Sequence, residues 1–500
     1  MSQVSEKTLA GLEPQSVWGF FIGIAAVPRP SKQEERIRKH VREVAEGRGL
    51  AVNEDRTGNL LIRVAATKGH EDAPVTVLQA HLDMVCEKNS STAHDFSSEG
   101  IHLVLETESK SGERIVRAEG TTLGADNGIG VALALAAATS PEVVHGPLEL
   151  LFTADEEDGM TGAKALTQES FRGRRMLNLD SEENDTIYIG CAGGCDTNLA
   201  WTLKTEPPSQ GGEICRVTVT GLRGGHSGCD IHEGRANAIK LLVRTLLRVP
   251  ATSLQLIEIS GGSKRNAIPR EAAAIVVGPV GTLEALKTAS ADVASEAQAE
   301  SCEPDVTVRV EREPDAPQPI CVSPNDTDRI LQALTAIPSG VLGMHPKVSA
   351  LVETSNNVST MTTEIRESQI VIAAGMLSRS SSDSRKRETF DQLAAIGRLA
   401  GAKVALGNEY PGWSPNPDSP TLAVCRRVYK EMFGDEPNVA AIHAGLECGI
   451  IGERVGGMDM VSLGPTIRGA HSPEERVYVD SVESTWRFLV ALLGAFAREH

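Results

Sequence analysis

The sequence alternates short β-branched runs with Ala- and Leu-rich helical segments over its first two hundred residues. Val75–Ala80 is a strand-like run, Gly130–Ala138 has the composition of a helix, and Leu148–Phe152 is a second apolar run of strand length. Strands that alternate with helices pack as an α/β sheet, usually with largely parallel strands. The alternation therefore predicts an α/β domain built on a mixed, mostly parallel sheet.

This pattern changes after residue 207 and returns near residue 408. Between these points the expected elements follow the order β-α-β-β-α-β, which is the ferredoxin-like arrangement. They are strands at Arg216–Thr220, Leu254–Ile259, Ala272–Val277 and Val306–Val310, and helices at Ala236–Leu247 and Leu283–Ala297. Residues 329–400 resemble part of a second copy. We therefore expect residues 1–207 and 408–500 to form the α/β catalytic domain, and residues 208–407 to form an inserted α+β domain, ferredoxin-like and partly duplicated.

Charge and hydropathy exclude several classes of partner. Lys and Arg number 49 and Asp and Glu number 67, which gives a net charge of −18. Proteins that bind nucleic acids rely on basic patches, so we expect no nucleic-acid partner. The sequence contains no run of 18 or more apolar residues, and we therefore expect no transmembrane helix and no membrane partner.

The apolar segment Val17–Val27 is the nearest match to the core of a signal peptide. Glu6 and Glu13 precede it together with Lys7, and a Pro-Arg-Pro tripeptide follows it in place of small cleavage-site residues. We therefore interpret the segment as a core helix. The nine cysteines are scattered without a C-x-x-C pair, which indicates neither a disulfide framework nor a thiolate zinc site. Together these features predict a cytoplasmic protein.

Acidic and histidine side chains follow several of the predicted strands. In open α/β sheets, ligands bind outside the carboxyl ends of the strands, so these side chains have a reason to converge. Imidazole and carboxylate groups are zinc ligands, and two histidines with three carboxylates are too many for one catalytic zinc but fit a two-metal site. Any one of these motifs is more often a solvated surface feature, but several in one chain favour a metal site. The residues concerned are His81, Asp83, Asp126, Glu156, Glu157, Asp180 and His471.

Seven strings of the sequence resemble the M20 family of co-catalytic zinc peptidases, and within it the aminoacyl-histidine (Xaa-His) dipeptidase group, also called peptidase D or bacterial carnosinase. Together they extend over nearly the whole chain, and no motif position departs from the pattern. They are AHLDMVCEK from Ala80, LGADNGIGVA from Leu123, ADEEDGMTGA from Ala154, LNLDSEE from Leu177, GLRGGHSGCDIHEGRANA from Gly221, HAGLECG from His443 and GPTIRGAHSPEERV from Gly464.

The resemblance implies a set of ligands for two zinc ions, with Mn²⁺ or Co²⁺ as substitutes that a carboxylate-rich site also accepts. Asp126 would bridge the two ions. His81 and Asp180 would complete one of them, and Glu157 and His471 the other. The family pattern also implies that the peptide bond after Asp126 is cis.

Two further acidic residues have roles in catalysis by the same resemblance. Asp83 would orient the ring of His81, as ligating imidazoles usually require. Glu156 would be the general base that takes a proton from metal-activated water and delivers it to the leaving amine.

The resemblance also implies that the inserted domain acts as a lid that carries substrate-binding residues. His226 would stabilise the oxyanion of the scissile carbonyl. Arg379 would clamp the α-carboxylate of the substrate through its planar guanidinium, and Asn266 would bind the same end. His443 and Glu447 would line the pocket around the N-terminal residue, whose free amine suits a carboxylate.

These features predict a zinc-dependent dipeptidase that hydrolyses small unblocked dipeptides, preferentially Xaa-His. Two alternatives in the same superfamily stay open, an N-acyl amino-acid deacylase and a tripeptide aminopeptidase, because the same metal site would serve each. A non-catalytic zinc-binding protein is disfavoured because it would have no need of a base at Glu156. Family members tend toward homodimers, but the sequence leaves the oligomeric state open.

Overall fold

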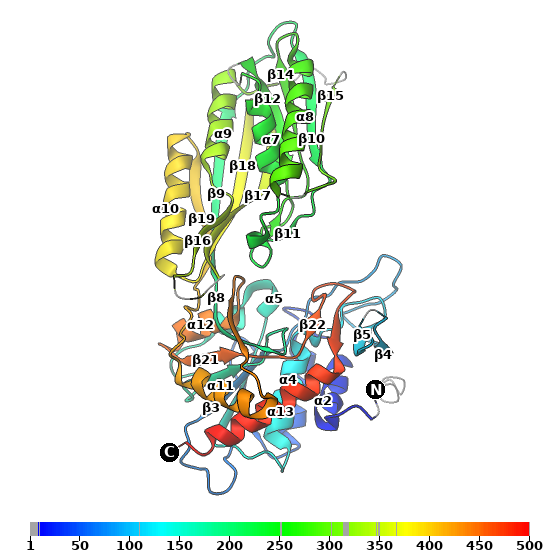
Figure 1. Ribbon diagram of the computed structural model, residues 1–500, viewed down its shortest axis with the longest axis vertical. Coiled ribbons are helices and arrows are strands. Elements are labelled where there is room, and N and C mark those ends of the chain that lie inside the picture. Colours follow the sequence, from blue (N-terminus) through cyan, green and yellow to red (C-terminus); the bar gives the residue numbers. More distant parts are fainter. Residues whose placement is uncertain are drawn as a thin grey trace. The chain divides into compact units, whose positions relative to one another are not determined.

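The computed structural model describes residues 9, 11–109, 111–250, 253–301, 303–313, 320–346, 348, 351–366 and 368–499. The chain divides into two compact units (Figure 1). Unit 1 comprises residues 1–190, 413–441 and 446–500, and unit 2 comprises residues 191–412 and 442–445. Both units combine helices with sheets, so the fold is of the mixed α/β class. In the part of the chain that the structure describes, no helix is long and apolar enough to cross a membrane.

Unit 1 contains an eight-stranded sheet in the order β1-β2-β6-β3-β7-β21-β8-β20. Strand β3 runs parallel to β6 and β7, and β21 runs parallel to β7, whereas β1–β2, β2–β6 and β21–β8 are antiparallel. The sheet is therefore mixed and parallel at its centre. Its strands are β1 (Ala51–Glu54), β2 (Leu60–Val64), β3 (Thr76–His81), β6 (Leu148–Thr153), β7 (Arg175–Asn178), β8 (Thr186–Cys191), β20 (Asn438–Ile442) and β21 (Asp459–Ser462).

A second, four-stranded sheet in unit 1 has the order β22-β23-β5-β4 and is antiparallel. Its strands are β4 (Leu103–Thr107), β5 (Arg114–Ala118), β22 (Ile467–Arg468) and β23 (Arg476–Tyr478). The helices of this unit are α2 (Gln15–Ala25), α3 (Glu35–Glu46), α4 (Ala125–Thr139), α5 (Glu156–Gly159), α6 (Thr161–Ala165), α11 (Pro420–Phe433), α12 (Glu447–Arg454) and α13 (Val479–Phe496).

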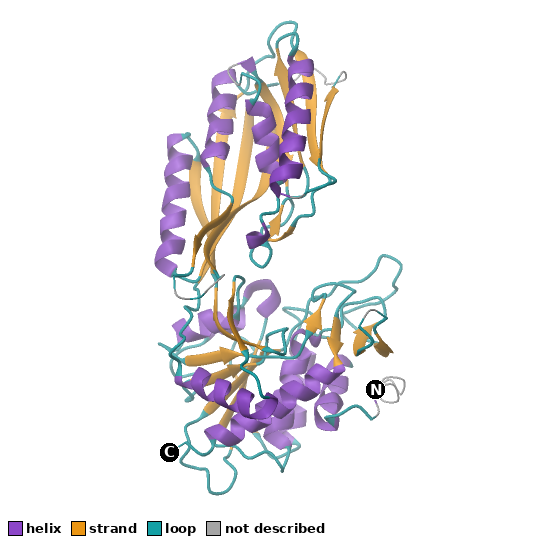
Figure 2. Ribbon diagram, viewed as in Figure 1, coloured by secondary structure: helices purple, strands orange, loops and turns teal. Residues whose placement is uncertain are grey.

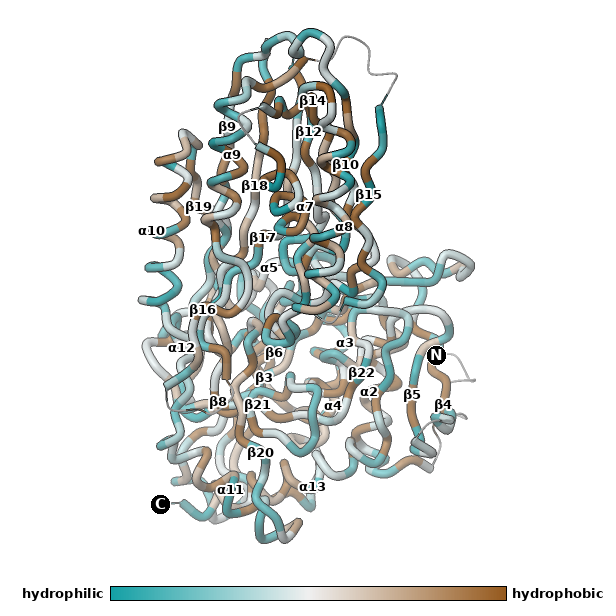
Figure 3. Tube along the Cα trace, turned by 45° about the horizontal axis from the view of Figure 1, so that its top comes forward, coloured by the Kyte–Doolittle hydropathy of each residue, from teal (hydrophilic) through white to brown (hydrophobic). Residues whose placement is uncertain are grey.

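The core of unit 1 lies around the central strands. Every residue of β3 and β6 is buried, as expected for parallel strands that are covered on both faces. The tube in Figure 3 is brown along stretches of these strands and teal over many peripheral loops. Helix α2 buries Val17, Trp18 and Phe21, so the prediction of a core helix in this segment is confirmed.

Unit 2 contains a larger antiparallel sheet in the order β15-β10-β14-β12-β17-β18-β9-β19, with β16 paired to β17. Helices α7, α8, α9 and α10 contact this sheet, and Figure 2 shows them layered against it. The strands are β9 (Gly193–Lys204), β10 (Glu213–Thr220), β12 (Gln255–Gly261), β14 (Ala272–Gly278), β15 (Thr307–Arg312), β16 (Gly340–Met344), β17 (Val352–Arg366), β18 (Gln369–Ser380) and β19 (Lys403–Tyr410).

The remaining elements of unit 2 are α7 (Ala238–Leu247), α8 (Thr282–Ser301), α9 (Pro324–Ala336), α10 (Asp383–Leu399), the 3₁₀ turn η1 (Ile231–Glu233), and the short pair β11 (Gly225–His226) and β13 (Ala267–Ile268). Apart from β11, η1 and β13, the elements between residues 213 and 312 follow the predicted order of strands and helices. Strand β9 lies before residue 207 and pairs with β18 and β19. These pairings place it in unit 2, whereas the sequence pattern had grouped it with the first segment.

Candidate metal centre and active site

The strand-end residues of unit 1 come from five separate segments. His81 is the last residue of β3, and Asp126 lies in the first turn of α4. Glu157 lies in α5 directly after β6, and Asp180 follows β7 by two residues. His471 lies on the connection between β22 and β23. The structure brings all five side chains together. His81, Glu157 and Asp180 meet because the connections at the carboxyl ends of neighbouring strands lie at one edge of the sheet, whereas Asp126 and His471 come from segments next to the four-stranded sheet.

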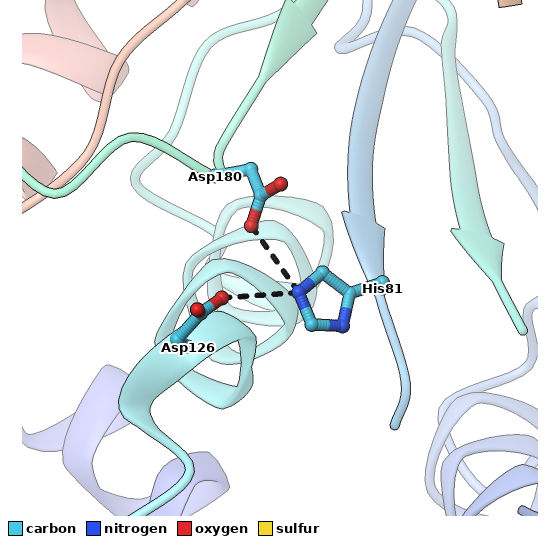
Figure 4. Close-up of side chains that lie close together, drawn as sticks. All are labelled: His81, Asp126 and Asp180. Carbon is cyan, nitrogen blue, oxygen red and sulfur yellow. Dashed lines mark hydrogen bonds and ion pairs between the residues drawn. The ribbon is translucent and has the colours of Figure 1, made fainter. Parts of the chain in front are cut away.

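Asp126 lies between the two histidines. Its Oδ1 atom is 3.0 Å from Nε2 of His81, and its Oδ2 atom is 3.2 Å from Nε2 of His471. Asp180 Oδ1 lies 3.4 Å from the same nitrogen of His81, and Figure 4 shows both carboxylates pointing at that ring. Glu157 Oε2 lies 3.1 Å from Nε2 of His471. Oδ1 of Asp126 therefore lies in one cluster of possible metal ligands, with His81 and Asp180, and Oδ2 lies in a second, with His471 and Glu157.

These donors fit divalent cations. Ligand atoms of His81, Asp126 and Asp180 lie within 4.8 Å of one another, as do those of Asp126, Glu157 and His471. Glu157 Oε1 is buried and accepts no hydrogen bond, and the contact of Asp180 Oδ1 with His81 is a long ion pair of 3.4 Å. Because a buried carboxylate oxygen without a partner is costly, a cation at each cluster would relieve an electrostatic penalty.

The electrostatics of the metal-free chain agree with this fit. Burial, followed by the charges of neighbouring carboxylates, raises the pKa of Glu157 and raises the pKa of Asp180 to about 6. Hydrogen bonds to Asp126 and Glu157 raise the pKa of His471 to about 11. Burial disfavours a charge on His81, but the surrounding carboxylates outweigh it and raise its pKa. Protons therefore occupy the cluster when cations are absent, and cation binding would release them.

Asp83 links the ring of His81 to the segment that carries the glutamate pair. It is fully buried, and its Oδ1 atom lies 3.4 Å from Nδ1 of His81. Oδ1 also accepts the N–H of Glu156 at 3.0 Å, while Oδ2 accepts the N–H of Glu157 at 3.2 Å and the hydroxyl of Ser31 at 2.7 Å. Although burial opposes ionisation, the contacts with His81 and these hydrogen bonds lower the pKa of Asp83 to about 2.

Glu156 lies beside this cluster, with a ligand atom within 4.8 Å of those of His81 and Glu157. Burial, with the charges of Glu157 and Asp180, raises its pKa. A carboxylate whose pKa is raised is suited to accept and return a proton.

The peptide bond between Asp126 and Asn127 is cis.

Residues 77–495 match the model of peptidase family M20/M25/M40. The chain belongs to this family. Peptidases of the M20 family depend on metal ions, and the donor clusters of unit 1 are candidate positions for them.

Relatives of this M20 chain cover nearly its whole length. It is 41% identical over 486 residues to the cytosol non-specific dipeptidase of Escherichia coli (strain K12), which covers 97% of this chain and 98% of the relative. The crystal structure of aminoacylhistidine dipeptidase from Vibrio alginolyticus matches with a TM-score of 0.85 and 41% identity over 97% of this chain and 98% of that chain. A tripeptidase from Staphylococcus aureus shares the fold, with a TM-score of 0.62 and 14% identity over 98% of this chain and 100% of that chain.

The predicted oxyanion and carboxylate residues lie in unit 2. Nδ1 of His226 accepts the N–H groups of Gly228 at 3.3 Å and Cys229 at 3.0 Å. Its Nε2 atom lies 3.3 Å from Nη2 of Arg379, whose Nη1 donates to the hydroxyl of Tyr410 at 2.9 Å. The guanidinium of Arg379 is a fixed donor that suits an anionic oxygen.

His443 lies in the same unit as His226 and Arg379. Its Nε2 is 2.7 Å from the hydroxyl of Ser355. Burial, together with the charge of Arg379, lowers its pKa to about 3, so its ring is neutral. A Cβ atom at Gly228 would lie 2.1 Å from the carbonyl oxygen of His443 and 3.1 Å from Nε of Arg379, so a glycine permits this close packing.

The other two predicted substrate residues differ in their surroundings. Asn266 is exposed, and its carbonyl oxygen accepts the N–H of Ser227 at 2.8 Å. Glu447 lies in unit 1 and is fully buried, and its Oε2 atom accepts hydrogen bonds from Gln79 at 2.7 Å and Thr153 at 2.5 Å. Burial raises the pKa of Glu447 to about 8.

Sequence reasoning missed several partners of the site. Ser31 binds Asp83, and Gln79 and Thr153 bind Glu447, although none of them carries a distinctive motif. Glu475 is 2% exposed and binds the turn that carries Asp126. Its position four residues after His471, in an acidic Glu-Glu pair, was the one available signal.

Proposed function

We propose that this protein is a zinc-dependent dipeptidase that hydrolyses unblocked dipeptides, preferentially those with histidine at the C-terminal position. The observation that carries the proposal is the position of Asp126, with one carboxylate oxygen directed at each of two histidines and Glu156 beside them. The names and identities of the dipeptidase relatives support the choice of substrate.

In this proposal two cations share Asp126, one with His81 and Asp180 and the other with Glu157 and His471. When bound, zinc would supply Lewis acidity that polarises the scissile carbonyl and lowers the pKa of water toward neutrality. The clusters of donor atoms support this assignment, and Mn²⁺ or Co²⁺ would bind the same carboxylate-rich site.

The residues around the ligands would move and hold the protons. Glu156 would accept a proton from the attacking water and return it to the leaving amine. Asp83 would keep Glu156 in place through its backbone N–H and would hold the ring of His81 from the opposite side. The 3.4 Å contact of Asp83 with the ring of His81 and its hydrogen bond from the N–H of Glu156 support this role.

Unit 2 would recognise the acidic groups of the substrate. Arg379 would bind the C-terminal carboxylate, with Asn266 at the same end, and His226 would donate from Nε2 to the oxyanion. The hydrogen bonds that Nδ1 of His226 accepts support a donor role for Nε2.

Glu447 and His443 are proposed to lie near the N-terminal residue of the substrate, as the resemblance implies. The buried position of Glu447 argues against direct contact with the ammonium group.

The remaining expectations extend this proposal. Residues 208–407 would form an inserted, ferredoxin-like lid domain, which the order of strands and helices supports. A cytoplasmic location is supported by the name of the Escherichia coli relative. A homodimer stays a prediction.

The test is histidine release from β-Ala-His, Gly-His and Ala-His, compared with Ala-Ala and N-acetyl-His, with and without a chelator. Chelator-sensitive release from the free-amine histidine dipeptides supports the proposal. Cleavage of N-acetyl-His in their place would identify a deacylase on the same metal site. A protein that holds two cations and hydrolyses none of these substrates would refute the proposal.

A further inference from the structure

A buried glutamate joins two segments of the metal centre. Glu475 ends the connection that carries His471, and its side chain is 2% exposed. Each of its carboxylate oxygens accepts two backbone N–H groups. Oε2 binds the N–H groups of Leu123 at 2.7 Å and Gly124 at 2.9 Å, and Oε1 binds those of Ala125 at 2.8 Å and Asp126 at 3.3 Å.

Two of these N–H groups, those of Ala125 and Asp126, open α4, and the other two belong to the residues directly before it. The first N–H groups of a helix have no partner within the helix and are normally satisfied by a capping side chain. The N-cap residue of α4 is Gly124, which has no side chain that could act as a cap. Glu475 supplies the missing acceptor from a distant part of the chain, and its negative charge suits a helix N-terminus.

Arg29 binds the same turn by donating to a carbonyl group of the turn. It is 2% exposed, and its Nη1 donates to the carbonyl oxygens of Leu82 at 3.0 Å and Asp83 at 2.7 Å. Its Nη2 donates to the carbonyl oxygen of Gly124. Arg29 therefore ties the segment directly after His81 to the turn that carries Asp126.

The turn is thus held on both sides by buried, oppositely charged groups. Burial lowers the pKa of Arg29, and the charge of Glu475 is the largest of the charges that oppose this effect. A Cβ atom at Gly124 would lie 2.4 Å from Nη2 of Arg29, so no larger residue fits there without displacing the guanidinium.

We propose that Glu475 and Arg29 are positioning residues that set the Asp126 carboxylate between His81 and His471. Glu475 fixes the turn against the His471 segment, and Arg29 fixes it against the His81 segment. This inference rests on the proposed metal centre. A ligand held in place before binding loses less freedom when the cation arrives, so release of the turn weakens cation binding by about 10- to 100-fold, as for other supporting residues of metal ligands.

The decisive variant is Glu475→Gln. The amide keeps the shape of the side chain but replaces one acceptor oxygen with a donor NH₂ group, which would face backbone N–H groups. Glu475→Asp keeps the charge and is expected to recover part of the affinity. Arg29→Lys loosens the same turn from its other side.

Glu149 offers a matched control. It is also a buried glutamate that accepts two backbone N–H groups, those of Arg172 at 2.8 Å and Gly173 at 2.9 Å. It lies on β6, away from the metal ligands. Glu149→Gln is therefore expected to lower the unfolding temperature without changing cation affinity.

The measurement is the dissociation constant for Co²⁺ and Zn²⁺ in competition with a chromophoric chelator, together with the visible absorption spectrum of bound Co²⁺ and the unfolding temperature of the metal-free protein. About 10- to 100-fold weaker binding in Glu475→Gln, with an altered Co²⁺ spectrum and an unchanged affinity in Glu149→Gln, supports the inference. Should Glu475→Gln fail to fold, Arg29→Lys provides the same readout.

Two results would overturn the inference. Unchanged affinity and an unchanged Co²⁺ spectrum in Glu475→Gln would reduce Glu475 to a structural cap of α4. Equal weakening in Glu475→Gln and Glu149→Gln would show a general loss of stability. Absence of cation binding in the unsubstituted protein would refute the proposed function itself, which is a distinguishable outcome.

Discussion

The two units gather opposite kinds of polar groups. Unit 1 brings carboxylates of four residues around two histidines, in a cluster where burial and mutual repulsion raise the pKa of Glu156, Glu157 and Asp180. Unit 2 brings the guanidinium of Arg379 within 3.3 Å of the ring of His226.

The difference indicates that the two units have different chemical functions. An acidic, partly unsatisfied cluster binds cations, whereas a buried guanidinium binds anions. A dipeptide hydrolase of the M20 type needs both properties, one for the reacting atoms and one for the carboxylate of the substrate. Variants in one unit should therefore leave the property of the other unit unchanged.

The largest effect is expected for Glu156→Gln. Loss of the general base should lower kcat by about 10²- to 10⁴-fold, while the content of bound cations, measured by elemental analysis, stays at that of the unsubstituted protein. Asp158→Asn is the control, because Asp158 is exposed and pairs with Lys32. Full turnover by Glu156→Gln would contradict the mechanism.

Arg379→Lys tests unit 2. Lysine keeps the charge but loses the planar fork, so kcat/KM for dipeptides should fall by about 10- to 100-fold, the cost of a lost charged hydrogen bond. Dipeptide amides, which lack the carboxylate, should show little further loss. The Co²⁺ affinity should be unchanged, and a parallel loss of cation binding would break the division between the units.

Cation removal tests unit 1 through stability. Ligands that bind only the folded state stabilise it by mass action, by about 2.7 kcal/mol at a free concentration one hundred times the dissociation constant. Addition of Zn²⁺ to the metal-free protein should therefore raise its unfolding temperature in a calorimetric scan. Asp126→Asn should abolish this shift, whereas Arg379→Lys should retain it.

The smallest effect is expected for the contribution of His443 to the loss of folding stability at low pH. Its folded-state pKa of about 3 lies below the ordinary value of 6.5 because of burial and the charges of Arg379, His226 and His232. The unfolded chain therefore binds a proton first, and stability is lost as the pH falls from 6.5 toward 3, by up to about 1.4 kcal/mol per pH unit. His443→Gln should lose less stability than the unsubstituted protein between pH 7 and pH 5 in urea unfolding. An identical pH dependence would contradict the assignment.

Local sequence patterns predicted His81, Glu157 and Asp180 of the candidate metal site. His81 and Asp180 follow apolar runs that form β3 and β7, and Glu157 follows the run that forms β6. Because a buried parallel strand requires such a run and its carboxyl end faces the ligand side of the sheet, the side chain after the run could be placed without a structure.

Partners that belong to separate segments could not be predicted in this way. Strand β9 lies next to the first segment in sequence, yet its pairing with β18 and β19 places it in unit 2. His443 and Glu447 are four residues apart, and the chain passes from unit 2 to unit 1 between them.

The sequence by itself determined the order of strands and helices, the acidic and histidine residues at strand ends, and the family. The tertiary structure alone decided which oxygen of Asp126 faces which histidine. It also decided that Glu475 binds the turn that carries Asp126. Glu475 and Leu123 are 352 residues apart, and their contact depends on the packing of the β22–β23 connection against the start of α4. Local propensity acts over a few residues, whereas such contacts form only when the whole unit has folded.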